Sequence, residues 1–513
     1  MAVQDGARPG VENVVLVVAD SLNRHFLPCF GGTTEFDLPT PNIDRLAARS
    51  MLFDTHYAGS LPCMPARREF LAGIQEFPWR PWGPMEPFDT SLALAARRAG
   101  VLTQLVTDHY HYFQHGSGGY TDDYHGYEFI RGHEFDTWRT APADPDPVLL
   151  RQVLADEAEG RDTFLTRAAY ARNVAGFGGE EDFFPARVFR AASDWIAANT
   201  ESKPWLLVVD SFDIHEPFHC PEPYASMFWG GDPRDPELTV WPRYGRIYAG
   251  GSALDERQLA FVRAQYAGKL VMWDRWFGTL LDALDRAGLW DSTMVVLTTD
   301  HGHYLGDHGW VGKPPAPVYD VLARTPLLIS HPAAARGGHT QAVTSAVDLY
   351  ATVLEALGAD PSPGPHSRSL LPLLTGATDR HRDWALYGYW GCSANVTDGV
   401  HTYHRPYRIG GEAACHSTML INPWEWFTPV EMPDRVEAGR FLSHATSSVW
   451  RYRTPSRPTH ERPMLFDLDG DPLQDDDLGG RSPDVERRME ALLLEALTDL
   501  GAPPEMRGQL GYE

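Results

Sequence analysis

Residues 60–73 (SLPCMPARREFLAG) contain the sharpest chemical pattern in the sequence, because a cysteine and an arginine stand four positions apart within them. Pro65 suits the first turn of a helix, which places Cys63 at the N-terminal end of that helix. There the helix dipole favours negative charge, lowers the pKa of a thiol and stabilises an oxyanion. Arg67 lies one turn later on the same face, so its guanidinium can lean back over Cys63. The alternative is a buried structural cysteine beside a surface arginine.

Three further residues with metal-binding side chains follow apolar runs. Asp20 comes directly after NVVLVVA, and Asp300 and His301 come directly after MVVLTT. Two carboxylates and an imidazole form a site for a divalent metal ion. The alternative for the two aspartates is that each caps a helix following its strand.

The elements that would position these residues are apolar strands. The runs 13–19, 205–209 and 294–299 have the composition of strands buried on both faces, and an aspartate follows each one. Residues just past the strand ends line the ligand crevice in open α/β sheets. Between these runs lie helical stretches at residues 40–48, with Thr40 as N-cap, and at 259–287. The alternation predicts an α/β fold.

The chain changes character near residue 375. Residues 360–366 are rich in proline and glycine, and short aromatic strands such as residues 384–390 follow. The chain closes with an amphipathic helix around residues 485–500, which Gly501 would end. We therefore predict a catalytic domain over residues 1–375 and a smaller α+β domain over residues 376–513.

Composition excludes several classes of function. The 513 residues include 44 Lys and Arg against 69 Asp and Glu, for a net charge of −25, which argues against nucleic-acid or anionic-membrane partners. An anionic substrate would need local positive charge in its site. The five cysteines form no CxxC pair, so we expect no disulfide framework. No signal-like segment opens the sequence and its early apolar run is too short to span a bilayer, so we predict a cytoplasmic protein.

The segment Cys63-Met-Pro-Ala-Arg67 matches the C-x-P-x-R motif of type I sulfatases, the formylglycine-dependent members of the alkaline-phosphatase superfamily. Further segments resemble that family in family order, and together they span nearly the whole chain: residues 13–20, 40–46, 213–218, 299–309 with Lys313, and 465–472. The resemblance implies a large central mixed, mostly parallel sheet flanked by helices, with a smaller C-terminal α+β domain.

The resemblance also implies roles for individual residues. Cys63 would be converted to formylglycine by a formylglycine-generating enzyme, and an oxygen of its hydrate would attack sulfur or phosphorus. One divalent ion would be held by Asp20, Cys63, Asp300 and His301. Ca²⁺ is the first choice for an oxygen-rich site, with Mn²⁺ or Mg²⁺ as alternatives because of the imidazole.

Three cationic or hydrogen-bonding residues would act with this nucleophile. Arg67, His215 and Lys313 would provide positive charge and hydrogen bonds to sulfate or phosphate oxygens. His215 would donate a proton to the leaving group as an imidazolium, while Lys313 would hold a nonbridging oxygen. The alternatives are that His215 only hydrogen-bonds a loop and that Lys313 is a solvated loop lysine.

Two departures from the family pattern affect specificity. Ser21 stands where many sulfatases carry a second acidic ligand, which resembles phosphonate monoester hydrolases of the same superfamily. Residues 107–112 lack the lysine of a Gly-Lys-x-His segment. His109 and His111 keep a two-residue spacing there, and their partial positive charge could bind substrate in its place. Surface histidines are the alternative.

We therefore predict a metal-dependent sulfatase that cleaves a sulfate ester of a small organic molecule. The first alternative is a phosphonate monoester or phosphodiester hydrolase that uses the same site. The second is a pseudoenzyme that binds an anion without turnover.

Overall fold

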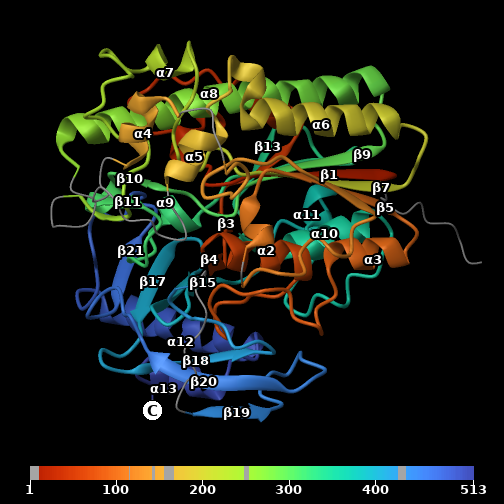
Figure 1. Cartoon of the computed structure of the whole chain (residues 1–513). Coiled ribbons are helices and arrows are strands. Elements are labelled where there is room, and N and C mark those ends of the chain that lie inside the picture. Colours follow the sequence, from red (N-terminus) through yellow and green to blue (C-terminus); the bar gives the residue numbers. More distant parts are fainter. Residues whose placement is uncertain are drawn as a thin grey trace, which may run out of the picture.

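A central sheet of eight strands organises the computed structural model, which describes residues 11–114, 116–140, 145–154, 167–247, 254–425 and 435–512 (Figure 1). In spatial order its strands are β13 (Gly338–Thr340), β2 (Met51–Phe53), β12 (Leu327–Ser330), β9 (Thr293–Thr298), β1 (Asn13–Ala19), β7 (Trp205–Ser211), β5 (Leu102–Thr107) and β6 (Gly126–Phe129). The five strands from β9 to β6 are parallel, whereas β12 is antiparallel to both of its neighbours. The predicted mixed, mostly parallel sheet is confirmed.

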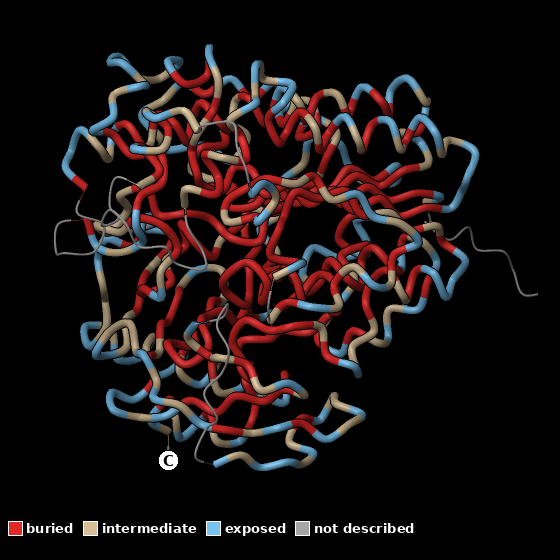
Figure 2. Tube along the Cα trace, viewed as in Figure 1, coloured by how far each residue is buried: buried red, intermediate tan, exposed pale blue. Residues whose placement is uncertain are grey.

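Helices cover both faces of this sheet. Alternate residues of β1 enter two different cores, with Val15 and Val17 on one side and Val14 and Leu16 on the other. The first core is closed by α1 (Pro41–Ala47), α6 (Phe184–Ala198) and α8 (Glu256–Ala287), and the second by α2 (Cys63–Ala72), α3 (Leu92–Arg98), α10 (Asp348–Ala356) and α11 (Leu371–Leu374). Figure 2 shows the central strands buried along their length. Burial on both faces explains why these strands are uniformly apolar.

A second sheet of five strands joins the C-terminal region to the start of α2. Its order is β21 (Met464–Asp467), β17 (His401–Pro406), β16 (Ser393–Thr397), β15 (Ala385–Tyr389) and β4 (Ser60–Leu61). Strand β4 runs parallel to β15, with Ser60 opposite Gly388. Helix α12 (Pro483–Asp499) packs against this sheet through Met489 and Leu493. The domain boundary at residue 375 stays a prediction, and the second sheet takes one of its strands from before that boundary.

Smaller elements complete the described chain. Three minor sheets contain β10 (Tyr304–Leu305), β11 (Trp310–Gly312) and β8 (Gly245–Arg246); β14 (Thr344–Ser345) and β3 (His56–Tyr57); and β18 (Glu412–Ser417), β20 (Val449–Pro455) and β19 (Val436–Gly439). The remaining α-helices are α4 (Pro147–Leu154), α5 (Ala168–Asn173), α7 (Tyr224–Met227), α9 (Asp320–Ala323) and α13 (Pro504–Gln509). Short 3₁₀ segments occur at Arg24–Phe26, Pro28–Phe30, Tyr110–Phe113, Glu180–Asp182 and Asp307–Gly309.

Some predicted boundaries differ from the structure for local reasons. The helix expected from residue 259 begins at Glu256, because the Asp255 carboxylate accepts a hydrogen bond from the Gln258 backbone N–H (2.8 Å) and Gln258 Oε1 accepts one from the Asp255 backbone N–H (3.1 Å). Thr40 occupies the predicted N-cap position and Pro41 the first helical position, but the Thr40 side chain makes no capping hydrogen bond. The C-terminal helix ends before Gly501, whose φ of +64° favours glycine.

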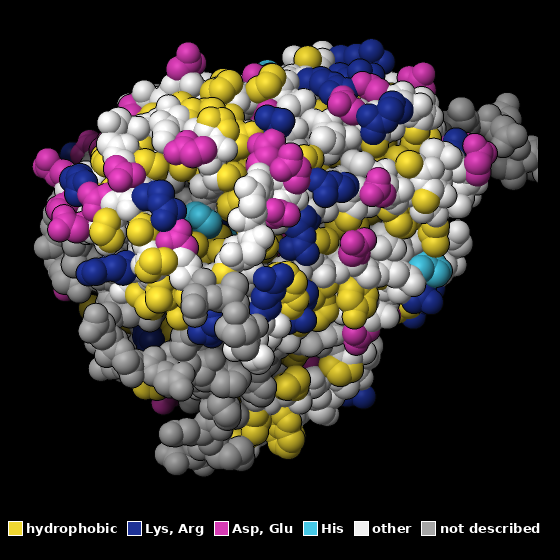
Figure 3. Space-filling view, turned by 45° about the horizontal axis from the view of Figure 1, so that its top comes forward, with side chains coloured by type: hydrophobic (Ala, Val, Ile, Leu, Met, Phe, Trp, Pro, Cys, Tyr) yellow, Lys and Arg dark blue, Asp and Glu magenta, His cyan; other side chains and the backbone are white. Residues whose placement is uncertain are grey.

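The surface and cysteine chemistry agree with the sequence. All five cysteines are free thiols. Over the face drawn in Figure 3, Lys and Arg side chains lie among acidic and hydrophobic ones. Within the described residues, no helix combines the length and the apolar character needed to cross a membrane.

Candidate active site

Two adjacent strand ends bring the predicted carboxylates together. Strands β1 and β9 are parallel neighbours that pair Val18 with Thr298, so they end at the same edge of the sheet. Asp20 follows the first strand and Asp300 the second, and both side chains are fully buried. Neither is followed by a helix, which rules out the helix-capping alternative. The site thus lies at the carboxyl edge of the sheet, as expected for an α/β fold.

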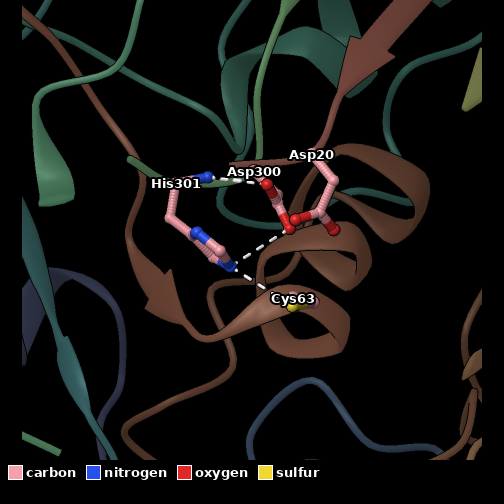
Figure 4. A group of neighbouring side chains, drawn as sticks. All are labelled: Asp20, Cys63, Asp300 and His301. Carbon is pink, nitrogen blue, oxygen red and sulfur yellow. Dashed lines mark hydrogen bonds and ion pairs between the residues drawn. The ribbon is translucent and has the colours of Figure 1, made fainter. Parts of the chain in front are cut away.

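Cys63 faces this edge from the first residue of α2 (Figure 4). Its Sγ lies 3.2 Å from Nε2 of His301, and potential ligand atoms of Asp20, Cys63, Asp300 and His301 all lie within 4.8 Å of one another. His301 Nδ1 lies 2.8 Å from the Gly302 carbonyl oxygen and donates to it, so Nε2 carries the lone pair of a neutral ring. Burial, followed by the Lys313 charge, lowers the pKa of His301 well below its usual value.

Arg67 is occupied by three carboxylates. Its Nε and Nη2 donate to the two oxygens of Asp210 at 2.8 Å each, and its Nη1 donates to Asp300 Oδ2 at 2.6 Å. Nη2 also lies 3.0 Å from Asp20 Oδ2. The side chain is fully buried. Nη1 also donates to the Cys63 carbonyl oxygen at 3.2 Å, so the side chain leans back over Cys63 as predicted. The guanidinium at the same time holds the ends of β1, β7 and the segment after β9 together, and its contact with a substrate stays a prediction.

The two ligand carboxylates carry unequal charge. Burial, followed by the charge of Asp20, raises the pKa of Asp300 to about 7. Burial acts against ionisation of Asp20 as well, but Lys313 and Arg67 outweigh it and hold the Asp20 pKa well below its usual value. Oδ2 of Asp20 accepts no hydrogen bond. Like charges this close in a buried site are stabilised by a further cation.

Lys313 is a buried cation rather than a solvated loop residue. Its Nζ lies 3.4 Å from Ser21 Oγ and 3.9 Å from Asp20 Oδ1, and the residue is 6% exposed. Burial opposes its charge, but Cys63, Glu216 and Asp20 together raise its pKa above the ordinary value. Ser21 has a positive φ of 62°, and its hydroxyl donates to Asp20 Oδ1 at 2.8 Å. The lysine therefore stays charged beside the predicted metal ligands.

His215 lies in the segment after β7 with its ring stacked on Phe212, 4.2 Å between centroids. Its Nδ1 donates to the Glu216 carbonyl oxygen at 2.7 Å. Burial is the main cause that lowers its pKa to about 4. The resting ring is therefore neutral, with a lone pair on Nε2, and the predicted imidazolium is not its resting form.

His109 and His111 are both buried, so the surface alternative is wrong for them. Nε2 of His109 lies 3.3 Å from Asp20 Oδ2, and Nε2 of His111 lies 3.3 Å from Glu134 Oε2. Burial, followed by the Arg67 charge, lowers the pKa of His109 well below its usual value. The ring is neutral at pH 7, so the positive charge predicted for His109 is absent.

A sequence model of the Sulfatase family matches residues 12–359, which is more than half of the chain. The chain belongs to the sulfatase family. That membership makes the protein a sulfuric ester hydrolase of the alkaline-phosphatase superfamily, as the motif around Cys63 predicts.

Curated relatives and solved structures agree with the family. This sulfatase is 27% identical over 438 residues to the multifunctional alkaline phosphatase superfamily protein PehA of Trinickia caryophylli, covering 73% of this chain and 78% of the relative. It is 25% identical to the choline-sulfatase of Rhizobium meliloti (strain 1021), covering 72% of each. The phosphonate monoester hydrolase of Agrobacterium radiobacter shares the fold, with a TM-score of 0.63, 20% identity, and coverage of 95% of this chain and 96% of that one.

Sequence reasoning missed two acidic residues of this sulfatase site. Asp210, the main partner of Arg67, could have been found from the sequence, because it directly follows the apolar run 205–209 of strand β7. Glu216 accepts a hydrogen bond from the Tyr244 hydroxyl, and its Oε2 lies 3.1 Å from His303 Nε2. Its only signal was adjacency to His215, since no local pattern shows which distant groups will surround a loop carboxylate.

Proposed function

We propose that this sulfatase hydrolyses a sulfate ester of a small organic molecule at the site formed by Asp20, Cys63, Asp300 and His301. The observation that supports it best is the position of Cys63. A helix N-terminus places it among three metal-type ligands that come from two other segments of the chain. A family cysteine at that place is the expected source of the nucleophile.

The donor atoms fit a divalent metal ion. Asp20 Oδ2 accepts no hydrogen bond, Nε2 of His301 presents a lone pair, and burial, followed by the charge of Asp20, raises the Asp300 pKa to about 7. With Cys63, these residues would hold one ion, Ca²⁺ first and Mn²⁺ or Mg²⁺ as alternatives. When bound, such an ion supplies neutralisation of the substrate anion and of the nucleophile.

The thiol of Cys63 is a poor nucleophile in this site. Burial, followed by the negative charge of Asp20, raises its pKa well above 9.0, so little thiolate forms at neutral pH. We therefore propose that a formylglycine-generating enzyme converts Cys63 to formylglycine, whose hydrated aldehyde supplies an oxygen nucleophile.

The surrounding residues divide the remaining tasks. Lys313 stays charged and would hold a nonbridging oxygen of the transferred group, while His109, as a neutral ring, and His111 would bind the substrate through hydrogen bonds. Arg67 would act indirectly, by fixing Asp20 and Asp300. His215 must gain a second proton at Nε2 before it can donate one to the leaving oxygen, because its Nδ1 proton is held by the Glu216 carbonyl.

A second candidate, hydrolysis of phosphonate monoesters or phosphodiesters, is favoured by Ser21. A hydroxyl stands where many sulfatases have a second acidic ligand, and it donates to Asp20 instead of adding a negative charge. With one fewer negative ligand, a bound metal ion would keep more positive charge for the nonbridging oxygens of a phosphodiester or phosphonate. The same residues would act on either ester.

Turnover of matched 4-nitrophenyl esters tests this proposal. We expect the metal-loaded, converted enzyme to have its highest kcat/KM on the sulfate, compared with the phosphate monoester, phosphodiester and phosphonate. A higher kcat/KM on the phosphonate or phosphodiester would favour the second candidate. No turnover of any ester, with metal bound and Cys63 converted, would overturn both and favour an anion-binding pseudoenzyme.

A further inference from the structure

A lysine lies inside the protein next to the segment that carries His215. Lys269 comes from the middle of α8 and is 1% exposed. A buried ammonium is costly unless its protons are all engaged. Lys269 Nζ donates to the carbonyl oxygens of His215 (2.7 Å) and Pro217 (2.8 Å), and it pairs with Asp213 Oδ1 at 2.5 Å. Three partners match the three protons of an ammonium group.

The two carbonyls lie on either side of Glu216, so the ammonium fixes the backbone immediately after the His215 ring. Two backbone amides fix the first half of this segment, before His215. Phe212 N–H donates to Asp108 Oδ1 at 2.6 Å, and Ile214 N–H donates to the Asp20 carbonyl at 3.0 Å. Lys269 is thus the side chain from α8 that holds the second half of the segment.

Charge balance keeps the ammonium in place. Asp213 Oδ1 lies 2.6 Å from Nε2 of His133 and also pairs with Lys269. Burial opposes ionisation of Asp213, but Lys269 and His133 outweigh it and lower its pKa. An anion therefore stays beside the lysine at neutral pH, and the pair forms a neutral buried unit.

We propose that Lys269 is a positioning residue for His215, which it holds in the orientation that reaches the leaving group. The proposal rests on the proposed function, because it needs His215 to act on the substrate. Lys269 affects His215 only through hydrogen bonds to main-chain carbonyls and does not contact the substrate, so it is not a catalytic residue.

A leaving-group series measured with Lys269→Met tests this role. The thioether keeps the length of the side chain and removes the ammonium. Because His215 matters most for leaving groups that need a proton, we expect kcat/KM on sulfates with poor leaving groups to fall by about 100-fold in both Lys269→Met and His215→Ala. On 4-nitrophenyl sulfate the loss should be about 3-fold. Adding Lys269→Met to His215→Ala should cause less than about 3-fold further loss.

Asp274→Asn is the matched control for stability. Asp274 is a buried charged residue of the same helix, α8, but its carboxylate accepts from the amides of Asn42 and Ile43, away from the His215 segment. We expect this variant to lower Tm and to leave the dependence of kcat/KM on leaving-group pKa unchanged. If Lys269→Met does not fold, Lys269→Gln, whose shorter amide can still donate to a carbonyl, should show the same dependence in weaker form.

Three outcomes have distinct meanings. Equal losses across the leaving-group series for folded Lys269 variants, or fully additive losses with His215→Ala, would overturn the positioning role and leave the sulfatase proposal standing. A wild-type enzyme with metal and converted Cys63 that turns over no ester would overturn the proposed function instead. Matching, non-additive losses would support both.

Discussion

One arginine side chain contacts three aspartate carboxylates in the interior of this protein. Arg67 bonds to Asp210 and Asp300 and lies 3.0 Å from Asp20, and all four side chains are fully buried. Removing one partner of such a network leaves charges buried without compensation. The network therefore makes the stability of the fold and the geometry of the metal ligands depend on the same guanidinium.

We expect Arg67→Met to lower the free energy of unfolding by about 3–5 kcal/mol, because it leaves buried carboxylates unpaired. Arg67→Lys should lose almost as much, since a single ammonium cannot bridge carboxylates in the planar, bidentate way of a guanidinium. Urea unfolding of the metal-free proteins measures both. Added divalent metal should restore part of the loss, and a variant as stable as wild type would contradict the shared role.

Asp20→Asn and Asp300→Asn should each lose the bound metal and the esterase activity together. Each change removes one of two carboxylate ligands and half of the charge that attracts the ion. Metal content by mass spectrometry and turnover of 4-nitrophenyl sulfate give independent readouts. Full metal occupancy in both variants would place the ion elsewhere, for example at Glu134, His215 and Glu216, whose ligand atoms also lie within 4.8 Å of one another.

The pKa of His215 predicts how activity varies with pH. Burial lowers that pKa to about 4, so the protonated ring becomes rarer as pH rises above 4. If the imidazolium donates the proton, kcat/KM on a poor leaving group should fall about tenfold per pH unit between pH 5 and 7 relative to a good one. The ratio of the two rates cancels effects common to both substrates. A ratio that does not change with pH would exclude the acid role.

The sequence predicted which residues would meet at this site better than it predicted their partners. Asp20, Asp300 and His301 could be placed because each lies just after an apolar run that predicts a buried strand. Cys63 could be placed because Pro65 predicts the first turn of a helix. The pairing of Arg67 with Asp210 depends on three segments that close only in the folded chain. The charge states of His109 and His215 depend on burial, which local patterns do not reveal.

At the scale of elements, strand β4 and helix α2 form one hydrogen-bonded unit around Cys63. Ser60 Oγ donates to Glu69 Oε1 at 2.6 Å and accepts from the amides of Glu76 (2.8 Å) and Phe77 (3.0 Å). Gly59 N–H adds a bond to the same carboxylate at 2.9 Å. These contacts fix the direction in which the chain enters α2, and hence the place of Cys63.

Ser60→Ala should therefore lower the free energy of unfolding by about 2–4 kcal/mol, because it leaves two buried amides without their acceptor. Ser91→Ala is the matched control, since Ser91 Oγ caps α3 by accepting from the Leu94 amide and otherwise donates only to the half-exposed Asp123, so its loss should cost about 1 kcal/mol. Urea unfolding measures both variants. Equal losses would show that the Ser60 network adds nothing beyond a single cap.

The C-terminal helix and the alternation of strands and helices were predictable because each has a local period. The pairing of β4 with β15 was not, because a two-residue strand has no period and its partner lies far along the chain. Through this pairing the C-terminal region is more closely joined to Cys63 than a boundary at residue 375 suggests.

At the scale of the whole molecule, aromatic contacts of the buried His366 join the two regions. The His366 ring stacks on Trp79 with 5.2 Å between centroids and meets the edge of His444, which comes from the C-terminal region. Its Nδ1 accepts a hydrogen bond from the Gln75 amide at 3.0 Å. A proton on Nδ1 would break that bond, and burial lowers the pKa of His366 to about 3.

This contact should make the protein sensitive to mild acid. The folded-state pKa of His366 lies below the unfolded value of about 6.5, so its stabilisation is complete above that pH and declines as pH falls toward 3. We expect the lowered pKa of His366 to account for a loss of about 2 kcal/mol in the free energy of unfolding as pH falls from 7 to 5. Urea unfolding of His366→Asn should show a flatter pH dependence than wild type, while the half-exposed His339→Asn should not.

The burial of Cys63 sets an order of events during synthesis. The thiol is 1% exposed, and the strand before it is completed only when Ser60 pairs with Gly388. At about 5–20 residues per second, a ribosome needs roughly 15 to 65 s to extend the chain between those two positions. If a formylglycine-generating enzyme converts Cys63, as proposed, its access to the thiol is greatest within that interval. The fraction of active molecules then depends on the rate of translation, and slower elongation beyond residue 63 should raise it.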